Sequence, residues 1–201
     1  MLPCLTNIIS KFITLIFYKN QFTPCLHTMH VMEVLQLRTK LYDRANALSY
    51  AHRWAMGRNP QYYDFEQLGG DCTNFASQVL YAGAGIMNPT PTFGWYYYDL
   101  YNRAPAWTGV EFLHSFLVYN RGIGPVAVET EVSQVIPGDI VQISFDGLVF
   151  GHSPIIVSVG DQPAPSNILI AAHTFNADYY PLNNFSYVRL RFLHITHVNV
   201  W

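Results

Sequence analysis

Cys72 is the residue whose surroundings most favour chemistry. It lies in the stretch GGDCTNF, where small and polar residues surround the thiol. A cysteine nucleophile reacts as a thiolate, so its pKa has to be brought toward or below neutral. The stretch that begins at Cys72, CTNFASQVLYAGAG, has helical spacing with Phe75, Val79 and Leu80 on one face. The thiol is therefore predicted at a helix start, where unpaired N–H groups act like about half a positive charge. A buried structural cysteine is the alternative interpretation, because cysteines are often buried.

Gly69 and Gly70 precede the nucleophile candidate and strengthen its functional interpretation. Two glycines let the backbone turn sharply and leave room for a substrate carbonyl beside the sulfur. The backbone N–H of Cys72 can then point at a developing oxyanion. Asp71, between the glycines and the cysteine, either supports this turn and the substrate site or simply caps the helix, and capping is favoured.

Two histidines are candidates for the base that such a thiol requires. His152 begins an apolar stretch after Asp146-Gly147 and Gly151, and His173 ends the next one, ILIAAHT. A histidine at a sheet edge that faces a helix start can reach a thiol across the interface. If the two strands are neighbours, His173 lies beside His152 and can orient its ring. Single histidines in strands are usually structural, so the pair carries more weight than either residue alone.

The elements that must position these residues change period along the chain. Residues 34–56 have apolar positions three and four apart and are predicted to be helical, ending at Gly57. A second helix is predicted from Cys72, and a third over residues 110–120, before which Thr108 and Glu111 make a capping box. The later segments 140–144, 152–160, 166–174 and 186–198 have the length and composition of strands. Helices followed by strands predict an α+β domain with an antiparallel sheet.

Composition excludes several classes of protein. The 201 residues have a net charge of −2 and only 12% charged residues, and they contain no basic run of the kind that binds nucleic acid. The hydrophobic fraction of 50% argues against disorder. The three cysteines show no CxxC spacing, so neither a zinc knuckle nor a disulfide framework is predicted, although Cys4 and Cys25 can pair in an oxidising compartment.

Residues 1–32 are interpreted as an N-terminal extension to a domain over residues 33–201. The apolar stretch Ile8 to Tyr18 is too short for a transmembrane helix, and no charged region precedes it. It is a divergent signal or surface anchor, a structured extension, or the product of a start codon assigned too far upstream. Met29 and Met32 favour the last interpretation, so the compartment stays open, with secretion or cell-wall association as candidates.

Several segments resemble one known family. YDRANALSYAHRWAMGRNPQYYDFEQLGGDCTNFASQVLYAGAG is similar to the putative amidase domain family, a papain-like group related to the NlpC-type and CHAP-type cell-wall hydrolases. WYYYDLYNRAPAWTGVEFLHSFL, PGDIVQISF, GHSPIIV and AAHTFNADYYPL also resemble it. The resemblance implies a papain-like fold and a triad in which Cys72 is the nucleophile, His152 the general base and acid, and His173 the orienting third residue. It also implies amide or peptide substrates, with peptidoglycan peptide as a candidate, and no cofactor.

Further residues are assigned to the oxyanion or substrate site. Related hydrolases use an upstream tyrosine at the oxyanion, which makes Tyr62 the first candidate and Tyr63 the second. Trp95 and the tyrosines that follow it either line a sugar- or peptide-binding groove or pack in the core. Asn176 to Asp178 depart from the family's usual spacing, so Asp178 is interpreted as a loop residue.

Three other functions remain open. A metal hydrolase would bind zinc through His152, His173 and a carboxylate such as Asp178, but the chain contains no HExxH motif. A non-catalytic module for binding cell wall or a partner would retain a vestigial papain-like site. A transferase would use the same thioester with an acceptor other than water.

Overall fold

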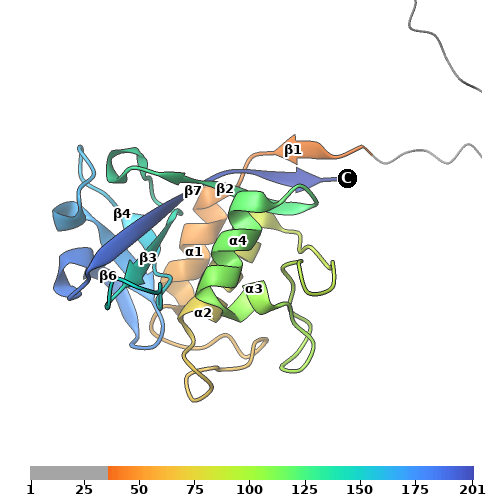
Figure 1. Cartoon of the computed structure of the whole chain (residues 1–201), viewed down its shortest axis with the longest axis horizontal. Helices are drawn as coiled ribbons and strands as arrows, with labels where there is room; N and C mark the ends of the chain where they lie inside the picture. Colours follow the sequence, from red (N-terminus) through yellow and green to blue (C-terminus); the bar gives the residue numbers. More distant parts are fainter. Residues whose placement is uncertain (1–35) are drawn as a thin grey trace, which may run out of the picture. The chain divides into compact units, whose positions relative to one another are not determined.

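The computed structural model describes residues 36–201, so the predictions for residues 1–32, Cys4 and Cys25 lie outside the described residues. The described chain is α+β, as predicted (Figure 1). Its helices are α1 (Arg44–Trp54), α2 (Cys72–Ala84), α3 (Pro105–Thr108) and α4 (Val110–Tyr119). Its strands are β1 (Arg38–Lys40), β2 (Gly124–Thr130), β3 (Ile140–Ser144), β4 (Ile155–Ser158), β5 (Leu169–Ala172), β6 (Ala177–Pro181) and β7 (Arg189–Val200).

The strands form one antiparallel sheet in the order β1-β7-β3-β4-β5-β6, and β2 also pairs with β7. The long β7 joins the two parts of the sheet, because it pairs with β2 over Gly124–Thr130 and with β3 through Ile140 to Ser144. The helices α1, α2 and α4 lie together beside the sheet (Figure 1). The two ends of the described chain meet where β1 pairs with the end of β7.

Alternation along the strands divides the interior into two apolar cores. Ile140 and Ile155 are partners across β3 and β4, and both lie in the core that contains the helices. Val141 and Ile156, one residue further along each strand, lie in a second core on the other face of the sheet. Helix α2 is buried on nearly all sides, since it packs between α1, α3 and the sheet. A rigid support is therefore built around the helix that begins at Cys72.

The start of the first predicted helix and the predicted capping box need correction. The first helix begins at Arg44 and not near residue 34, because the Asp43 side chain accepts the Asn46 N–H as an N-cap, while 38–40 join the sheet as β1. The helix predicted over residues 110–120 is confirmed as α4, and the short helix α3 precedes it. The capping box is absent, because the Glu111 carboxylate accepts the Phe150 N–H and pairs with Arg191.

Candidate active site

The chain turns into α2 through two glycines in the left-handed region. Gly69 has φ of 100° and Gly70 has φ of 102°, conformations that residues with a Cβ rarely adopt. A Cβ on Gly70 would also lie 3.2 Å from the Thr174 Oγ1. Helix α2 then begins at Cys72, as predicted, and ends at Gly85, whose left-handed backbone donates its N–H to the Tyr81 carbonyl. The sequence signal for a thiol at a helix start was therefore local and sufficient.

The Cys72 thiol is buried between the helix start and two strand ends. Its sulfur lies 3.6 Å from the Thr73 Oγ1 and 4.0 Å from the Gly151 carbonyl oxygen. Burial raises the pKa of the thiol, and hydrogen bonds from Thr73, the Ser153 backbone and the Thr174 hydroxyl oppose this rise. The resting sulfur is therefore a protonated thiol at neutral pH, and a base has to remove its proton for it to react.

Thr174 reaches the sulfur from a strained turn. It directly follows His173 at the end of β5 and has φ of 84°, which is uncommon for a β-branched residue. Such strain persists where surrounding structure holds it, and it is often found at functional sites.

The two chain neighbours of His152 contact the thiol, but the ring of His152 turns elsewhere. The Ile143 N–H donates to its carbonyl oxygen at 3.1 Å, and the two residues form an isolated bridge, so they share the face of the second core. The following residue, Ser153, faces α2 and lies 3.4 Å from the Thr73 hydroxyl. Within residues 36–201, no hydrogen bond joins His152 to Cys72.

The imidazole of His152 is buried and electrically neutral. Burial lowers its pKa to about 4. Its Nε2 has no hydrogen-bond partner among the described residues. The unpaired nitrogen is free to accept a proton, as the predicted base requires, but a pKa of about 4 makes the buried ring a weak base in this resting arrangement.

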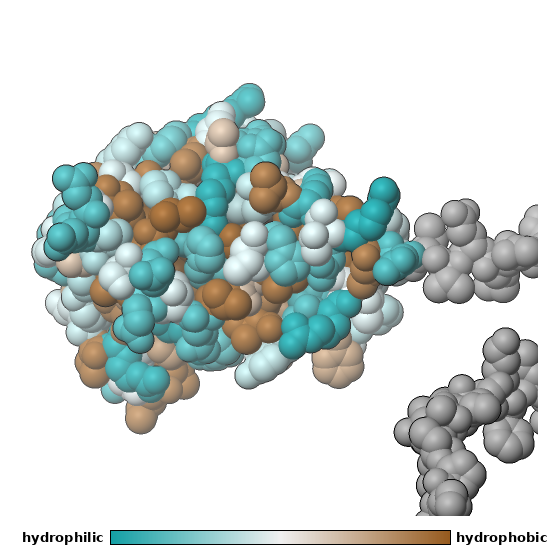
Figure 2. Space-filling view, turned by 90° about the horizontal axis from the view of Figure 1, so that it is seen from above, coloured by the Kyte–Doolittle hydropathy of each residue, from teal (hydrophilic) through white to brown (hydrophobic). Residues whose placement is uncertain are grey.

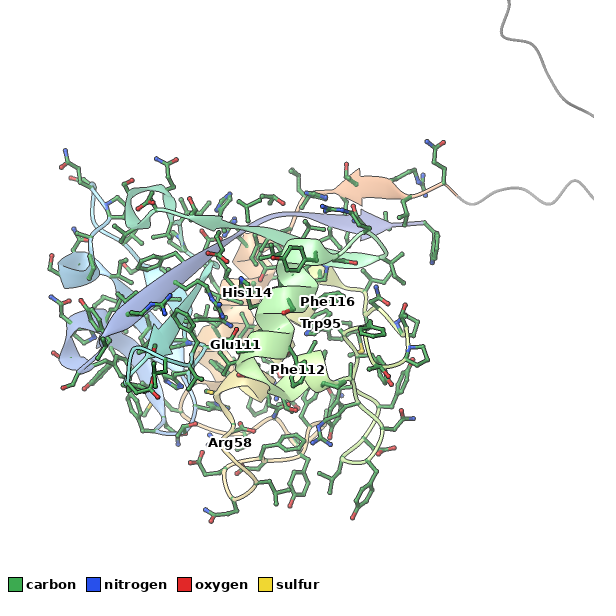
Figure 3. The ribbon with its side chains drawn as sticks, in the orientation of Figure 1. Arg58, Trp95, Glu111, Phe112, His114 and Phe116 are labelled. Atoms are coloured by element: carbon green, nitrogen blue, oxygen red, sulfur yellow. The ribbon has the colours of Figure 1, made fainter. Side chains whose placement is uncertain are left out.

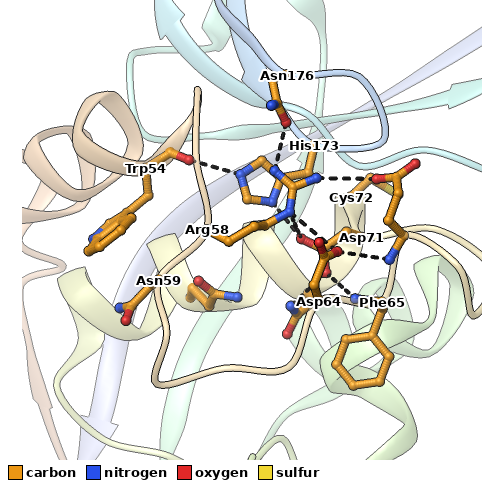
Figure 4. A network of polar contacts seen from close by, with 12 residues as sticks. Trp54, Arg58, Asn59, Asp64, Phe65, Asp71, Cys72, His173 and Asn176 are labelled. Atoms are coloured by element: carbon orange, nitrogen blue, oxygen red, sulfur yellow. Dashed lines mark hydrogen bonds and ion pairs between the residues drawn. The ribbon is translucent and has the colours of Figure 1, made fainter.

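His173 is held by partners other than the one predicted. Its Nδ1 lies 2.5 Å from the Asp71 Oδ2, and its Nε2 lies 2.9 Å from the Trp54 carbonyl oxygen (Figure 4). Its ring also stacks on Phe75 at 4.0 Å. Both nitrogens face acceptors, an arrangement that a doubly protonated imidazole satisfies. The structure therefore does not bring His173 to the ring of His152 as its orienting partner.

Asp71 occupies the N-cap position of α2 without capping it. Its carboxylate makes no capping hydrogen bond to the helix, and it is fully buried. It accepts the Phe65 N–H at 2.9 Å and the Asn74 Nδ2 at 2.8 Å, in addition to its contact with His173. Asp71 thus lies at the predicted N-cap position, but its carboxylate does not cap the helix. It accepts hydrogen bonds from a loop N–H and from a side chain of α2, and it contacts a histidine at a strand end.

Arg58 completes this network and is a site residue that the sequence did not reveal. Its Nε lies 3.4 Å from the Asp71 Oδ2, and its Nη1 donates to the Asn176 Oδ1 at 2.6 Å (Figure 4). It also pairs with Asp64 and Glu66 at 3.3 and 3.2 Å. In the sequence, Arg58 is a single charged residue in the turn Arg58-Asn59-Pro60 after α1, and nothing in that turn indicates its partners.

The other predicted substrate residues lie in packed surroundings. Trp95 is 0% exposed and donates its Nε1 proton to the Ser77 Oγ at 3.0 Å, so it cannot line a substrate groove. It stacks on Phe116, and Figure 3 shows the two residues close together at α4. Tyr62 is half-buried and stacks on Trp107 at 5.8 Å, and burial raises its pKa to about 12. Its predicted role at the oxyanion stays a prediction.

The proposed zinc ligands are not gathered together. Asp178 lies in β6, contrary to its interpretation as a loop residue, and its Oδ1 is 2.9 Å from the His52 Nδ1. In the part of the chain that the structure describes, no three His, Cys, Asp or Glu side chains are arranged to hold a metal ion. Over the same residues, no helix has the length and apolarity needed to cross a membrane.

Comparison with known proteins gives the family. The chain is 31% identical over 140 residues to the uncharacterized protein YhbB of Bacillus subtilis (strain 168), a match that covers 68% of this chain and 42% of YhbB. It thus spans less than half of that relative's length. No solved structure matches the chain. The model of the family described as "Putative amidase domain" matches residues 41–195, a span that includes Cys72, His152 and His173. The chain therefore belongs to this putative amidase domain family.

Proposed function

We propose that the protein is a cysteine-dependent amide-bond hydrolase that works through a thioester, with Cys72 as nucleophile and His152 as base. One observation carries the proposal. The sulfur at the start of α2 contacts the residues on both sides of His152, through the Gly151 carbonyl and the Ser153 backbone. The unpaired Nε2 of His152 supports it further, because a base needs a free nitrogen. Membership of the amidase family supports the reaction type.

The first half of the reaction forms the thioester. The ring of His152 turns toward the sulfur as substrate binds and takes the thiol proton, and the sulfur attacks the amide carbon. Catalytic hydrogen bonds are often absent or long before substrate binds, so the resting separation is consistent with this step. The oxyanion accepts a hydrogen bond from the Cys72 N–H, one of the N–H groups at a helix start without an intrahelical acceptor.

The second half releases the products. His152 gives its proton to the leaving amine as the C–N bond breaks, which leaves the acyl group on Cys72 as a thioester. Water then attacks the thioester carbon while His152 takes its proton, the C–S bond breaks, and the proton returns to the sulfur. His173 and Asp71 touch neither substrate nor sulfur in this scheme. Their role is to hold the start of α2 against the end of β5.

Peptide amides of the cell wall are the proposed substrate class. This part of the proposal depends on the resemblance of GGDCTNFASQ and GHSPIIV to cell-wall hydrolases. The low content of charged residues and the many tyrosines also suit a surface that holds polar, uncharged ligands.

The decisive experiment is a Cys72→Ala variant assayed on muropeptides and on small peptide amides. We expect kcat to fall by roughly three orders of magnitude or more, as for loss of a covalent nucleophile. His152→Ala should give a similar loss. His197→Ala, a histidine in β7 that contacts Thr196, is the matched control and should keep its activity. Turnover by Cys72→Ala at the wild-type rate would refute the proposal.

A non-catalytic binding module is the second candidate, and the buried thiol with its raised pKa favours it. Alkylation of Cys72 by iodoacetamide at pH 6, followed by mass spectrometry of the peptide that contains it, separates the two. A peptide amide that occupies or acylates an active site should slow the alkylation of Cys72, whereas it should leave the alkylation rate of a vestigial site unchanged.

A further inference from the structure

Three phenylalanines surround the ring of His152. The ring centroids of Phe145, Phe175 and Phe185 lie 6.5, 6.4 and 5.6 Å from that of His152. They come from three separate segments, namely the end of β3, the turn after β5 and the segment before β7. Phe185 also contacts both others, at 6.4 and 5.4 Å, so the rings form one continuous surface. We call these three residues the phenylalanine cluster.

Two of the three rings in the phenylalanine cluster are unusually exposed for phenylalanine. Phe145 is 49% exposed and Phe175 is 41% exposed, although large aromatic side chains are normally covered. Exposed apolar surface that is continuous and next to reactive groups is typical of a ligand site. Tyr180 supports the cluster, because its ring packs edge-on against Phe175 and Phe185.

The phenylalanine cluster offers no charge to a ligand. Among the described residues, Arg189 and Arg191 stack on Phe150 and not on the cluster. The Oδ1 of Asp146, next to Phe145, accepts hydrogen bonds from the Ser144 hydroxyl and from two backbone N–H groups. A charged side chain buried against the three rings themselves would lose water without gaining a partner.

The sulfur of Cys72 is connected to the same surface. The Thr174 hydroxyl that hydrogen-bonds the sulfur directly precedes Phe175, and the Gly151 carbonyl 4.0 Å from it directly precedes His152. An acyl group bonded to the sulfur thus begins between the two segments that carry a phenylalanine and the base. Phe175 and the ring of His152 therefore each lie one residue along the chain from a contact of the sulfur.

We infer that the phenylalanine cluster is the acyl subsite of the enzyme, and that the residue on the carbonyl side of the scissile amide carries an apolar or aromatic side chain. The inference rests on the proposed function, and it names the substrate class of the same site. Among cell-wall peptides and other amides, the subsite would favour substrates with an apolar residue on the carbonyl side of the scissile amide over substrates with a carboxylate or an ammonium group at that position. An apolar pocket of this kind discriminates by about 10- to 200-fold.

The test uses N-acetyl amino acid amides that share one fluorogenic amine and differ only in the acyl residue. We expect kcat/KM for phenylalanine and leucine to exceed that for glutamate and lysine by at least about tenfold. Phe175→Ala and Phe145→Ala should each reduce this ratio severalfold. Phe93→Ala is the matched control, because Phe93 is 83% exposed and lies on the loop between Asn88 and Trp95, and its ratio should equal that of the wild type.

A binding measurement keeps the inference separate from the reaction. The Cys72→Ala variant is titrated with N-acetyl-phenylalaninamide and N-acetyl-glutamine amide, and Kd is read by calorimetry. Tighter binding of the aromatic amide, lost on adding Phe175→Ala, supports the subsite even if no amide is hydrolysed, and in that case only the proposed function fails. Equal Kd values, or turnover that is equal or faster for glutamate and lysine, would overturn the subsite and leave the proposed function standing.

Discussion

A fully buried carboxylate next to the nucleophile candidate is the most consequential single residue. Asp71 has no exposed surface, and it compensates by accepting hydrogen bonds from Phe65 and Asn74 and by pairing with His173 and Arg58. Its neighbour in sequence is Cys72, so any movement of this carboxylate moves the sulfur. The pair that it forms with His173 is therefore a positioning device as well as part of the core.

Asp71→Asn should destabilise the protein strongly. Removing one member of a buried, hydrogen-bonded ion pair leaves the other charge without compensation and costs about 3–5 kcal/mol. The free energy of unfolding, measured by urea denaturation, checks this value. The same substitution at Asp178 is the control, because its pair with His52 is 20–30% exposed and should contribute less than about 1 kcal/mol. Equal losses at the two sites would show that the buried pair is not special.

The partners of Asp71 could not be predicted from the sequence, whereas the place of Cys72 could. A helix start is a local property, and two glycines followed by a polar residue and an apolar period specify it. The network that includes Arg58, Asp64 and Asn176 joins loops far apart along the chain, and only the folded sheet brings them together. His173 was found as a candidate because it ends a strand, but which groups its nitrogens meet depends on where α1 ends and α2 begins.

At the scale of elements, the turn through Gly69 and Gly70 before α2 is the feature that positions the candidate active site. The turn has to bring Asp71 under the helix and Cys72 against the ends of β4 and β5 within a few residues. Both glycines have positive φ, but they differ in what surrounds them. Gly69 has open space where a side-chain carbon would lie, whereas a Cβ on Gly70 would meet the Thr174 hydroxyl at 3.2 Å.

Gly69→Ala and Gly70→Ala should therefore differ in activity more than in stability. Each forces an alanine into the left-handed region at a cost of about 1–2 kcal/mol. Gly70→Ala also pushes against Thr174, which hydrogen-bonds the sulfur, and should lower kcat on a peptide amide severalfold more than Gly69→Ala. Gly57→Ala, at ordinary φ with open space around it, should change neither melting temperature nor kcat appreciably. Identical kcat values for the two turn variants would contradict this account.

The sequence predicted the type of most helices and strands correctly, but their bounds less well. Helix α2 and strands β3, β4, β5 and β7 lie where apolar period and composition indicated. Short edge strands such as β1 and β6 were missed, because they are held by pairing with a neighbour rather than by a pattern of their own. Trp95 was misjudged for a related reason, since aromatic composition does not distinguish a groove from a stack of rings around Trp107.

At the scale of the whole molecule, only a small fraction of the residues is charged, so many apolar side chains lie on the surface. Figure 2 shows hydrophobic side chains spread between hydrophilic ones over the face it presents. Helical spacing in the first half and strand patterns in the second predicted an α+β domain, and the described residues do fold as an α+β unit. With so few ionised groups, the response of stability to pH depends on a small number of buried residues.

His152 should dominate the loss of stability in mild acid. Its pKa is about 4 in the folded protein against an ordinary value of 6.5, so the fold favours the neutral ring. Above pH 6.5 the ring is neutral in both states and the contribution is complete. As pH falls from 6.5 to about 4, the unfolded chain takes up a proton that the folded chain does not, and about 3 kcal/mol is lost. The rings that face His152 are those of Phe145, Phe175 and Phe185, none of which titrates.

The measurement is urea unfolding at half-unit steps from pH 4 to pH 8 for the wild type and for His152→Gln. The difference in unfolding free energy between the two proteins removes the shared titration of the carboxylates. It should fall by about 3 kcal/mol toward acid, because glutamine has no proton to gain. His197→Gln should give a difference that stays nearly constant with pH. A His152→Gln difference that is equally flat would show that this imidazole titrates normally and that the fold does not favour its neutral form.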